Sequence, residues 1–274
     1  GKLLIDGGMN GIGATYINDG SGKIALSLTV AAQLDNDPDD LELAAGYTIY
    51  KVMITNPNSK FGNQMIPINI RINNQFLDGK TAVADVNGDG HLDIIVSYSA
   101  KSVNSKLYAY TLIKGSPILI AQNYIPGIVE TNGWPSIADV DGNGIPNILI
   151  SKNNSINNFE YDGTNLLKLK WSYVVRDTGA TTGITCFDLN GDGTYEIVYR
   201  DNYNLLLIDG SVNPPQIIDS IKCLAGTFSE YPIIANIDHS RIAQICVTCT
   251  DNSSLDFKYS FGYLTAFGSP DSLP

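Results

Sequence analysis

Short apolar runs rich in β-branched residues recur along the chain, and each follows a polar loop that contains aspartate, asparagine or glycine. The clearest are IIVSY at 94–98, ILISK at 148–152 and IVYRD at 197–201. None of them extends into the 3.6-residue periodicity of an amphipathic helix, and β-branched residues favour strands. The pattern therefore predicts an all-β chain.

Further strands are indicated by segments in which aromatic or apolar residues alternate with polar ones. Such alternation places successive side chains on opposite faces of a sheet. The longer apolar run LLLI at 205–208 fits an inner strand that is buried on both faces. The segments are KLYAYTLIK at 106–114, FEYDG at 159–163, LLKLKWSYVV at 166–175, LLLIDG at 205–210 and YLTAFGS at 263–269.

The polar loop with the most regular chemistry lies in ADVNGDGHLDIIV, residues 84–96. Its positions 1, 3, 5 and 9 are Asp85, Asn87, Asp89 and Asp93, and His91 at position 7 would offer its backbone carbonyl. Calcium takes about six to eight oxygen ligands, and an alternating acidic loop with glycine at position 6 supplies them. The loop is therefore a predicted calcium site.

Two further copies of this loop follow, and the recurrence strengthens the prediction. Together with two altered copies, the first positions fall at intervals of about 50 residues, which is typical of a propeller or a solenoid. The predicted ligands are Asp139, Asp141, Asn143, Ile145 and Asn147 in the third copy along the chain, and Asp188, Asn190, Asp192, Thr194 and Glu196 in the fourth.

The first and the fifth copies depart from the pattern. The first, at 32–46, begins with Gln33 and has one extra residue before its last acid; we expect it to bind calcium with altered geometry, through Asp35, Asp37, Asp39 and Glu42. The fifth, at 235–247, keeps Asn236 and Asp238 but has Ser240, Arg241 and Gln244 at positions 5, 6 and 9, so we expect no metal there. Two to four structural calcium ions are thus predicted.

Two alternative interpretations of these loops are less favoured. Aspartate, asparagine and glycine favour tight turns without any metal, but three well-formed copies at nearly constant spacing favour metal loops. Helix-flanked EF-hands are disfavoured because the flanking segments are strand-like.

The loop pattern D-x-[DN]-x-[DN]-G-x-x-[DEN], with a strand on each side, resembles the FG-GAP/VCBS repeats of integrin-α-like β-propellers. The resemblance covers about residues 28–268 and implies a β-propeller of four-stranded blades with calcium-binding hairpin loops, with five recognisable repeats in this chain. Clear FG and GAP signatures are lacking. We expect 28–274 to form the propeller, as a fragment of a longer multidomain chain, and 1–27 to be an additional strand or partial blade.

A narrower resemblance concerns LDNDPDDLEL at 34–43, NGWPSIADVDGNG at 132–144 and the ending YLTAFGSPDSLP. These segments look like parts of large Bacteroidota gliding-motility-associated or adhesin-like surface proteins exported by type IX secretion. No sorting domain of that system is present.

Composition changes this picture only in part. The formal net charge is −11, and half of the 28 acidic residues lie in the five loops, so the acidity argues for metal and against nucleic acid. No apolar stretch approaches the roughly 20 residues that a membrane span needs. Several calcium loops favour an extracellular or cell-surface location.

The four cysteines support export only weakly, because a disulfide of Cys223 with Cys246 or Cys249 and buried free thiols are both compatible with the spacing. Zinc is less favoured, since only Cys246 and Cys249 have ligand-like spacing.

No catalytic constellation emerges. His91 and His239 lie inside loops, and no G-x-S-x-G or H-E-x-x-H motif is present. We therefore expect a non-enzymatic module for adhesion or protein–protein interaction, with a protein or glycan ligand or a neighbouring domain as partner. The alternative is a carbohydrate-binding module or a calcium-dependent polysaccharide lyase. A third option is a spacer without ligand.

Overall fold

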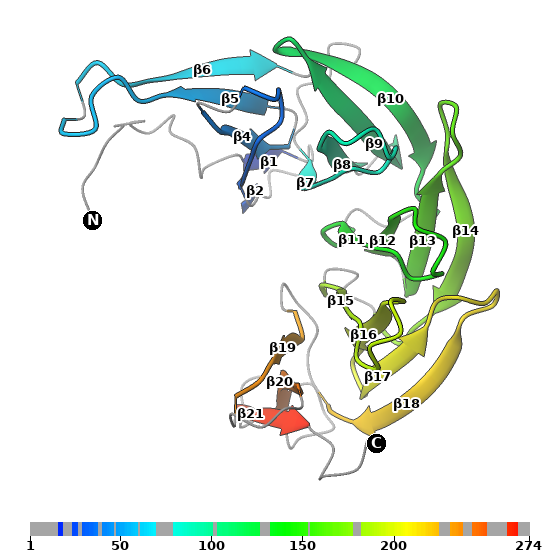
Figure 1. Cartoon of the computed structure of the whole chain (residues 1–274). Helices are drawn as coiled ribbons and strands as arrows, with labels where there is room; N and C mark the ends of the chain where they lie inside the picture. Colours follow the sequence, from blue (N-terminus) through cyan, green and yellow to red (C-terminus); the bar gives the residue numbers. More distant parts are fainter. Residues whose placement is uncertain are drawn as a thin grey trace. The chain divides into compact units, whose positions relative to one another are not determined.

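The strands of the protein are joined into antiparallel sheets in the order in which they occur along the chain (Figure 1). The computed structural model describes residues 16–18, 24–26, 29–37, 40–46, 48–59, 61–69, 79–100, 103–126, 132–152, 154–177, 182–224, 231–237, 243–250 and 262–267. No helix occurs among these residues, and so none has the length and apolarity of a membrane-crossing helix. The all-β prediction is confirmed.

The chain divides into two compact units, each of which is described separately. The first comprises Gly1–Glu130 and Glu160–Lys168, and the second comprises Thr131–Phe159 and Leu169–Pro274.

Two four-stranded sheets and a two-stranded pair lie in the first unit. Strands β1 and β2 pair with each other, and the other two sheets have the orders β3-β4-β5-β6 and β7-β8-β9-β10. The bounds are Tyr16–Asn18 (β1), Ile24–Leu26 (β2), Val30–Ala32 (β3), Glu42–Ala45 (β4), Thr48–Met53 (β5), Gln64–Asn69 (β6), Lys80–Ala84 (β7), Asp93–Ala100 (β8), Val103–Ile113 (β9) and Ser116–Tyr124 (β10).

Three sheets follow along the chain, with the orders β11-β12-β13-β14, β15-β16-β17-β18 and β19-β20-β21. In the third sheet only three strands are described. The bounds are Ser136–Ala138 (β11), Asn147–Lys152 (β12), Ser155–Tyr161 (β13), Leu167–Val174 (β14), Thr185–Phe187 (β15), Glu196–Arg200 (β16), Asn204–Asp209 (β17), Gln216–Lys222 (β18), Ile233–Ala235 (β19), Gln244–Thr250 (β20) and Gly262–Phe267 (β21).

The apolar runs of the sequence form the second strand of each sheet, as expected for inner strands. Every residue of β12 and of β16 is buried, whereas β18 is exposed along nearly its whole length. The sequence runs IIVSY and ILISK lie within the inner strands β8 and β12, and IVYRD lies in β16 except for its last residue; each run starts at the second residue of its strand. Within residues 1–27, the segments YIN and IAL form β1 and β2.

The hydrophobic core is made where neighbouring sheets of one unit pack against each other. In the first unit, Ile49 of β5 and Ile94 of β8 belong to one buried cluster with Tyr98, Tyr108 and Tyr110. In the second unit, one cluster joins the β11–β14 sheet to the β15–β18 sheet, and another joins the β15–β18 sheet to β20. Several tyrosines therefore serve packing between sheets.

Hydroxyl groups also tie first strands to the neighbouring sheet. Thr81 Oγ1 accepts a hydrogen bond from Gly46 N at 2.6 Å in the first unit. In the second unit, Thr185 Oγ1 donates to the carbonyl of Pro232 at 2.6 Å, and Ser136 donates to the carbonyl of Ile184.

One disulfide, Cys223–Cys249, joins the end of β18 to β20, and Cys186 and Cys246 are free thiols. The antiparallel bridge between Leu224 and Thr250 brings Cys223 next to Cys249. Cys246, three residues earlier on the same strand, projects from the opposite face. Of the pairings left open by the sequence, Cys223 with Cys249 is the one that forms.

Candidate metal-binding loops

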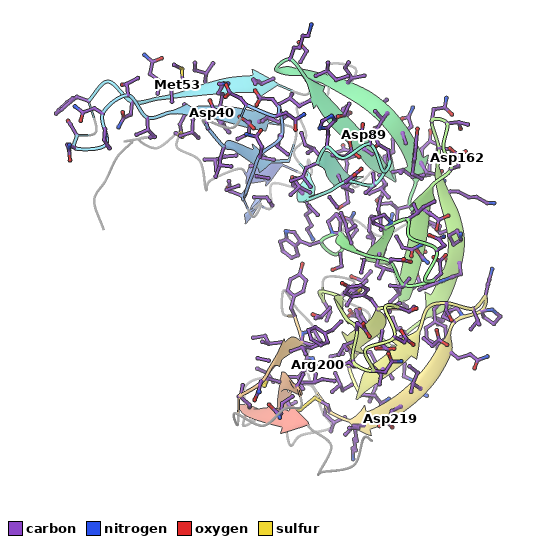
Figure 2. All side chains as sticks on the ribbon, viewed as in Figure 1. Asp40, Met53, Asp89, Asp162, Arg200 and Asp219 are labelled. Carbon is purple, nitrogen blue, oxygen red and sulfur yellow. A yellow bond between two sulfur atoms is a disulfide. The ribbon has the colours of Figure 1, made fainter. Side chains whose placement is uncertain are left out.

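Each acidic loop connects the first strand of a sheet to its second strand. The loops at 85–93, 139–147 and 188–196 join β7 to β8, β11 to β12 and β15 to β16, respectively. Their glycines at positions 4 and 6 all have positive φ, for example +74° at Gly88 and +86° at Gly90. That conformation lets the backbone turn back on itself. Figure 2 labels Asp89, which lies in the loop at 85–93.

In the loop at 85–93, the Asp85 carboxylate is the centre of the turn. Its Oδ1 accepts hydrogen bonds from Gly88 N at 2.7 Å and Asp89 N at 3.1 Å, and its Oδ2 accepts one from Gly90 N at 2.8 Å. Asn87 Oδ1 accepts from Asp89 N at 2.9 Å, and Asn87 Nδ2 donates to Asp89 Oδ2 at 3.1 Å. The predicted ligands at positions 1, 3 and 5 therefore converge on one turn.

The loop at 188–196 repeats these contacts. Asp188 accepts from Gly191 N at 2.7 Å and from Gly193 N at 3.0 Å. Asn190 Nδ2 donates to Asp192 Oδ2 at 2.9 Å. The two loops thus share one backbone conformation, set by the same residue types at the same spacing.

The loop at 139–147 keeps the fold of the turn but has less negative charge. Asp139 Oδ2 accepts from Gly144 N at 2.7 Å, and positions 5 and 9 are the neutral Asn143 and Asn147. Lys170 Nζ of β14 lies 3.4 Å from Asp141 Oδ2. On charge alone, this loop is the weakest of the three as a cation site.

Position 7 adds a backbone group in each loop. The backbone N–H of His91, Ile145 or Thr194 donates to the side chain at position 5, at 2.9, 2.7 and 2.8 Å respectively. In Asp192 this hydrogen bond lowers the pKa of the carboxyl group. The predicted role of the His91 backbone carbonyl as a metal ligand stays a prediction.

The residue at position 9 has a structural role that the sequence did not reveal. Its side-chain oxygen accepts a hydrogen bond from the backbone N–H of position 2, and the same bond occurs in all five repeats at 2.8 to 3.1 Å. The pairs are Leu34–Glu42, Val86–Asp93, Val140–Asn147, Leu189–Glu196 and Ile237–Gln244. Carboxylates and neutral amides serve equally as the acceptor.

Asp93, like Glu42, is fully buried, and only one of its carboxylate oxygens is paired. Oδ2 accepts from Val86 N, whereas Oδ1 has no hydrogen-bond partner in the described part of the chain. Burial, followed by the charges of Asp89 and Asp85, raises the pKa of Asp93 to about 7. Burial also raises the pKa of Glu196. A buried carboxylate of this kind is stabilised by a cation.

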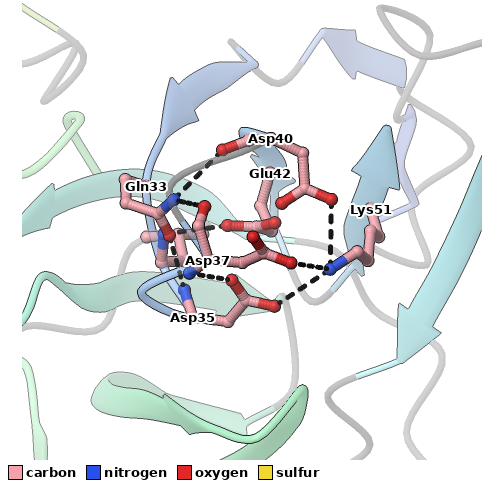
Figure 3. Close-up of polar contacts among 7 residues, drawn as sticks. Gln33, Asp35, Asp37, Asp40, Glu42 and Lys51 are labelled. Atoms are coloured by element: carbon pink, nitrogen blue, oxygen red, sulfur yellow. Dashed lines mark hydrogen bonds and ion pairs between the residues drawn. The ribbon is translucent and has the colours of Figure 1, made fainter. Parts of the chain in front are cut away.

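The first loop brings together a different set from the one predicted (Figure 3). Carboxylate oxygens of Asp35, Asp40 and Glu42 lie within 4.8 Å of one another. No other group of three His, Cys, Asp or Glu side chains among the described residues meets that distance. Asp40 was not predicted, because the extra residue in this loop shifts the register, and Asp39 lies outside the described residues.

Lys51 of β5 also belongs to the first loop. Its Nζ lies 3.4 Å from Asp35 Oδ2, 3.4 Å from Asp37 Oδ2 and 3.1 Å from Asp40 Oδ2. The hydrogen bond to Asp40 is the main reason that the pKa of Lys51 is raised. Gln33, at position 1, donates from Nε2 to the carbonyls of Asp37 and Asp40 and so holds the turn without a charge.

In the fifth repeat, only part of the loop is described. Gln244 Oε1 accepts from Ile237 N at 2.8 Å, whereas Asp238, Ser240 and Arg241 lie outside the described residues. The prediction that this copy binds no metal therefore stays a prediction.

The comparisons with known proteins agree with this arrangement. Residues 85–150 and 139–199 match the family described as FG-GAP-like repeat. A search of curated proteins found no match. The chain thus contains FG-GAP-like repeats within an all-β fold of four-stranded sheets.

Among solved structures, a similar one is an Agrocybe aegerita lectin that specifically recognises non-reducing terminal N-acetylglucosamine. It is 15% identical with a TM-score of 0.50, over 82% of this chain and 63% of the lectin. The V. cholerae biofilm matrix protein Bap1 is 13% identical with a TM-score of 0.32, over 80% of this chain and 30% of that protein. This chain therefore spans less than two thirds of either.

Proposed function

We propose that this chain is a calcium-stabilised, non-enzymatic β-propeller module that mediates protein–protein interaction or adhesion at the cell surface or outside the cell. The FG-GAP-like repeats support the architecture. The main support for calcium comes from Asp93. Its carboxylate is buried, and one of its oxygens has no hydrogen-bond partner in the described part of the chain.

The donor chemistry of the loops fits calcium. Carboxylate, amide and backbone carbonyl oxygens are ligands of this hard cation, and soft ligands are absent from these three loops. Asp85, Asp89 and Asp93 would hold one ion, and Asp188, Asp192 and Glu196 a second. Asp139 and Asp141 would hold a third more weakly, since Lys170 lies beside Asp141.

Calcium would act here by removing repulsion. Burial first, and then the charges of Asp89 and Asp85, raise the pKa of Asp93, and a divalent cation would offset both the burial of the charge and the repulsion. A site that binds only the folded chain, at a calcium concentration about 100 times its Kd, adds roughly 2.7 kcal/mol to the stability. Sheets held in this way would present the loops at their other ends as a rigid recognition surface.

The test is thermal unfolding of the purified chain in about 2 mM calcium and in EDTA, with magnesium as the control ion. One saturated site shifts the midpoint by several degrees in a domain of this size. Asp188→Asn should reduce the calcium-dependent shift, whereas the exposed Asp219→Asn on β18, remote from the loops, should not. Equal midpoints in calcium and EDTA would contradict the proposal.

Carbohydrate binding is the second candidate, because the lectin described above shares the fold and recognises a sugar. Trp134 and Tyr231, with ring centroids 6.4 Å apart, form an aromatic pair in the second unit. A glycan array that includes N-acetylglucosamine-terminated glycans, together with an absorbance assay for β-elimination of uronates, separates a lectin or lyase from a protein-binding module.

A further inference from the structure

The first acidic loop differs from the others in that one lysine of the same chain contacts three of its carboxylates. In the loop at 139–147, Lys170 lies beside Asp141. Lys51 lies directly opposite Glu42 in the antiparallel pairing of β4 with β5. From that position its ammonium group reaches the carboxylates of Asp35, Asp37 and Asp40 together, as Figure 3 shows.

The corresponding place in the other sheets holds no lysine. Ile94 pairs with Tyr110, and Ile197 pairs with Ile208. Continuing each register by one residue therefore sets Thr111 opposite Asp93 and Asp209 opposite Glu196. In the described part of the chain, no lysine or arginine forms an ion pair with the carboxylates of the loops at 85–93 and 188–196.

The first loop nevertheless retains the oxygen set of a cation site. The oxygens of Asp35, Asp40 and Glu42 lie within 4.8 Å of one another. Glu42 is fully buried, and its Oε1 has no hydrogen-bond partner among the described residues. Calcium bonds oxygen at about 2.3–2.6 Å, so an ion among these oxygens would occupy the space next to the Lys51 ammonium and be repelled by it.

We propose that the Lys51 ammonium is the resident cation of the first loop and keeps calcium out, and that replacing Lys51 with a neutral residue turns this loop into a calcium site. The inference rests on the proposed function, because it compares the first loop with loops that are proposed to bind calcium. It predicts that ion pairs stabilise the first sheet and that calcium does not change its stability.

The experiment measures calcium bound per chain after dialysis, by metal analysis and by calorimetric titration. Lys51→Met, which removes the charge and keeps an unbranched side chain only one atom shorter, should bind one more calcium than the native chain. Lys51→Arg, which keeps the charge, should bind the same number as the native chain. Adding Asp35→Asn to Lys51→Met should remove the gained ion.

A second arm leaves Lys51 in place, in case Lys51→Met does not fold. Asp35→Asn and Glu42→Gln, each made in the native background, should leave the bound calcium unchanged, whereas Asp188→Asn should lose one ion. Loss of one ion in Asp35→Asn or Glu42→Gln would overturn the inference, and so would a folded Lys51→Met that gains none. If the native chain binds no calcium, the proposed function fails, but a gain of one ion in Lys51→Met would still support the inference.

Discussion

The residue at position 9 of each loop has two roles that can be separated: it accepts a hydrogen bond, and where it is acidic it supplies a negative charge. It closes the hairpin by accepting the N–H of position 2, and a neutral amide does this as well as a carboxylate, as Asn147 shows at 2.9 Å. Its negative charge is useful only to a cation, because a buried charge without one is costly. The loops can therefore be tested for metal by removing the charge and keeping the hydrogen bond.

Asp93→Asn should have opposite effects with and without calcium. In EDTA we expect the variant to be more stable than the native chain at about pH 8, by about 1 kcal/mol or more, since it no longer buries an unpaired charge. In calcium the native chain should be the more stable of the two. Urea unfolding of both chains under both conditions measures this, and a variant that is less stable in both would contradict it.

The same residue predicts a pH dependence of the native chain in EDTA. The folded pKa of Asp93, about 7, lies above the ordinary value of about 4. The folded state therefore binds more protons than the unfolded state between these values, and the contribution of Asp93 to stability falls as pH rises from about 4 to 7. Asp93→Asn should lose this part of the pH dependence, which unfolding midpoints across that range would show.

A glycine in the second unit makes room for an aromatic ring. A Cβ atom on Gly183 would lie 2.1 Å from the ring of Tyr231. Gly183→Ala should therefore destabilise the protein by about 1–3 kcal/mol through overpacking. In a Tyr231→Ala background the same change should cost much less; an equal cost in both backgrounds in urea unfolding would argue against the contact.

At the scale of elements, the strands and loops follow from short-range patterns, and these could be predicted. The acidic loops could be placed between strands because the turn-forming residues and the strand-forming residues are adjacent in the sequence. Lys51 was missed because its contact depends on where the β4–β5 hairpin turns, at Gly46, whose φ is +58°. The signal available in the sequence was Gly46, because a turn at that glycine pairs Glu42 with Lys51 across the hairpin.

Cysteine pairing was open for a related reason. Cys246 and Cys249 lie on one strand, and only the bridge between Leu224 and Thr250 shows which of them faces Cys223. The sequence predicts position 9 as a metal ligand. Its hydrogen bond to position 2 could not be predicted, because it depends on how deeply the side chain is buried.

The Cys223–Cys249 disulfide, with a sequence separation of 26, should contribute to the stability of the second unit. For a loop of that length the loss of unfolded-state entropy corresponds to about 3–4 kcal/mol. Cys223→Ser with Cys249→Ser should lower the free energy of unfolding by this order. Dithiothreitol should reproduce the loss in the native chain and have no effect on the double variant.

At the scale of the whole molecule, charge balance links the loops to the solvent. The formal net charge is −11, and three divalent ions, with six positive charges, would bring it to about −5. Self-repulsion should therefore be stronger without calcium. Raising sodium chloride from about 20 to 200 mM should raise the unfolding midpoint more in EDTA than in calcium. Equal increments under both conditions would contradict loop charge as the cause.

The hydrogen bond from Ile237 to Gln244 in the fifth repeat has a consequence for how such chains diversify. A substitution that replaces a carboxylate at position 9 with an amide leaves this hydrogen bond in place. A loop that binds calcium would then lose its ion without losing its sheet. Descendants of one duplicated ancestor can then drift in ion content while the order of their strands is preserved by selection. Homologous arrays should differ from one another in the number of metal sites more readily than in the number of sheets.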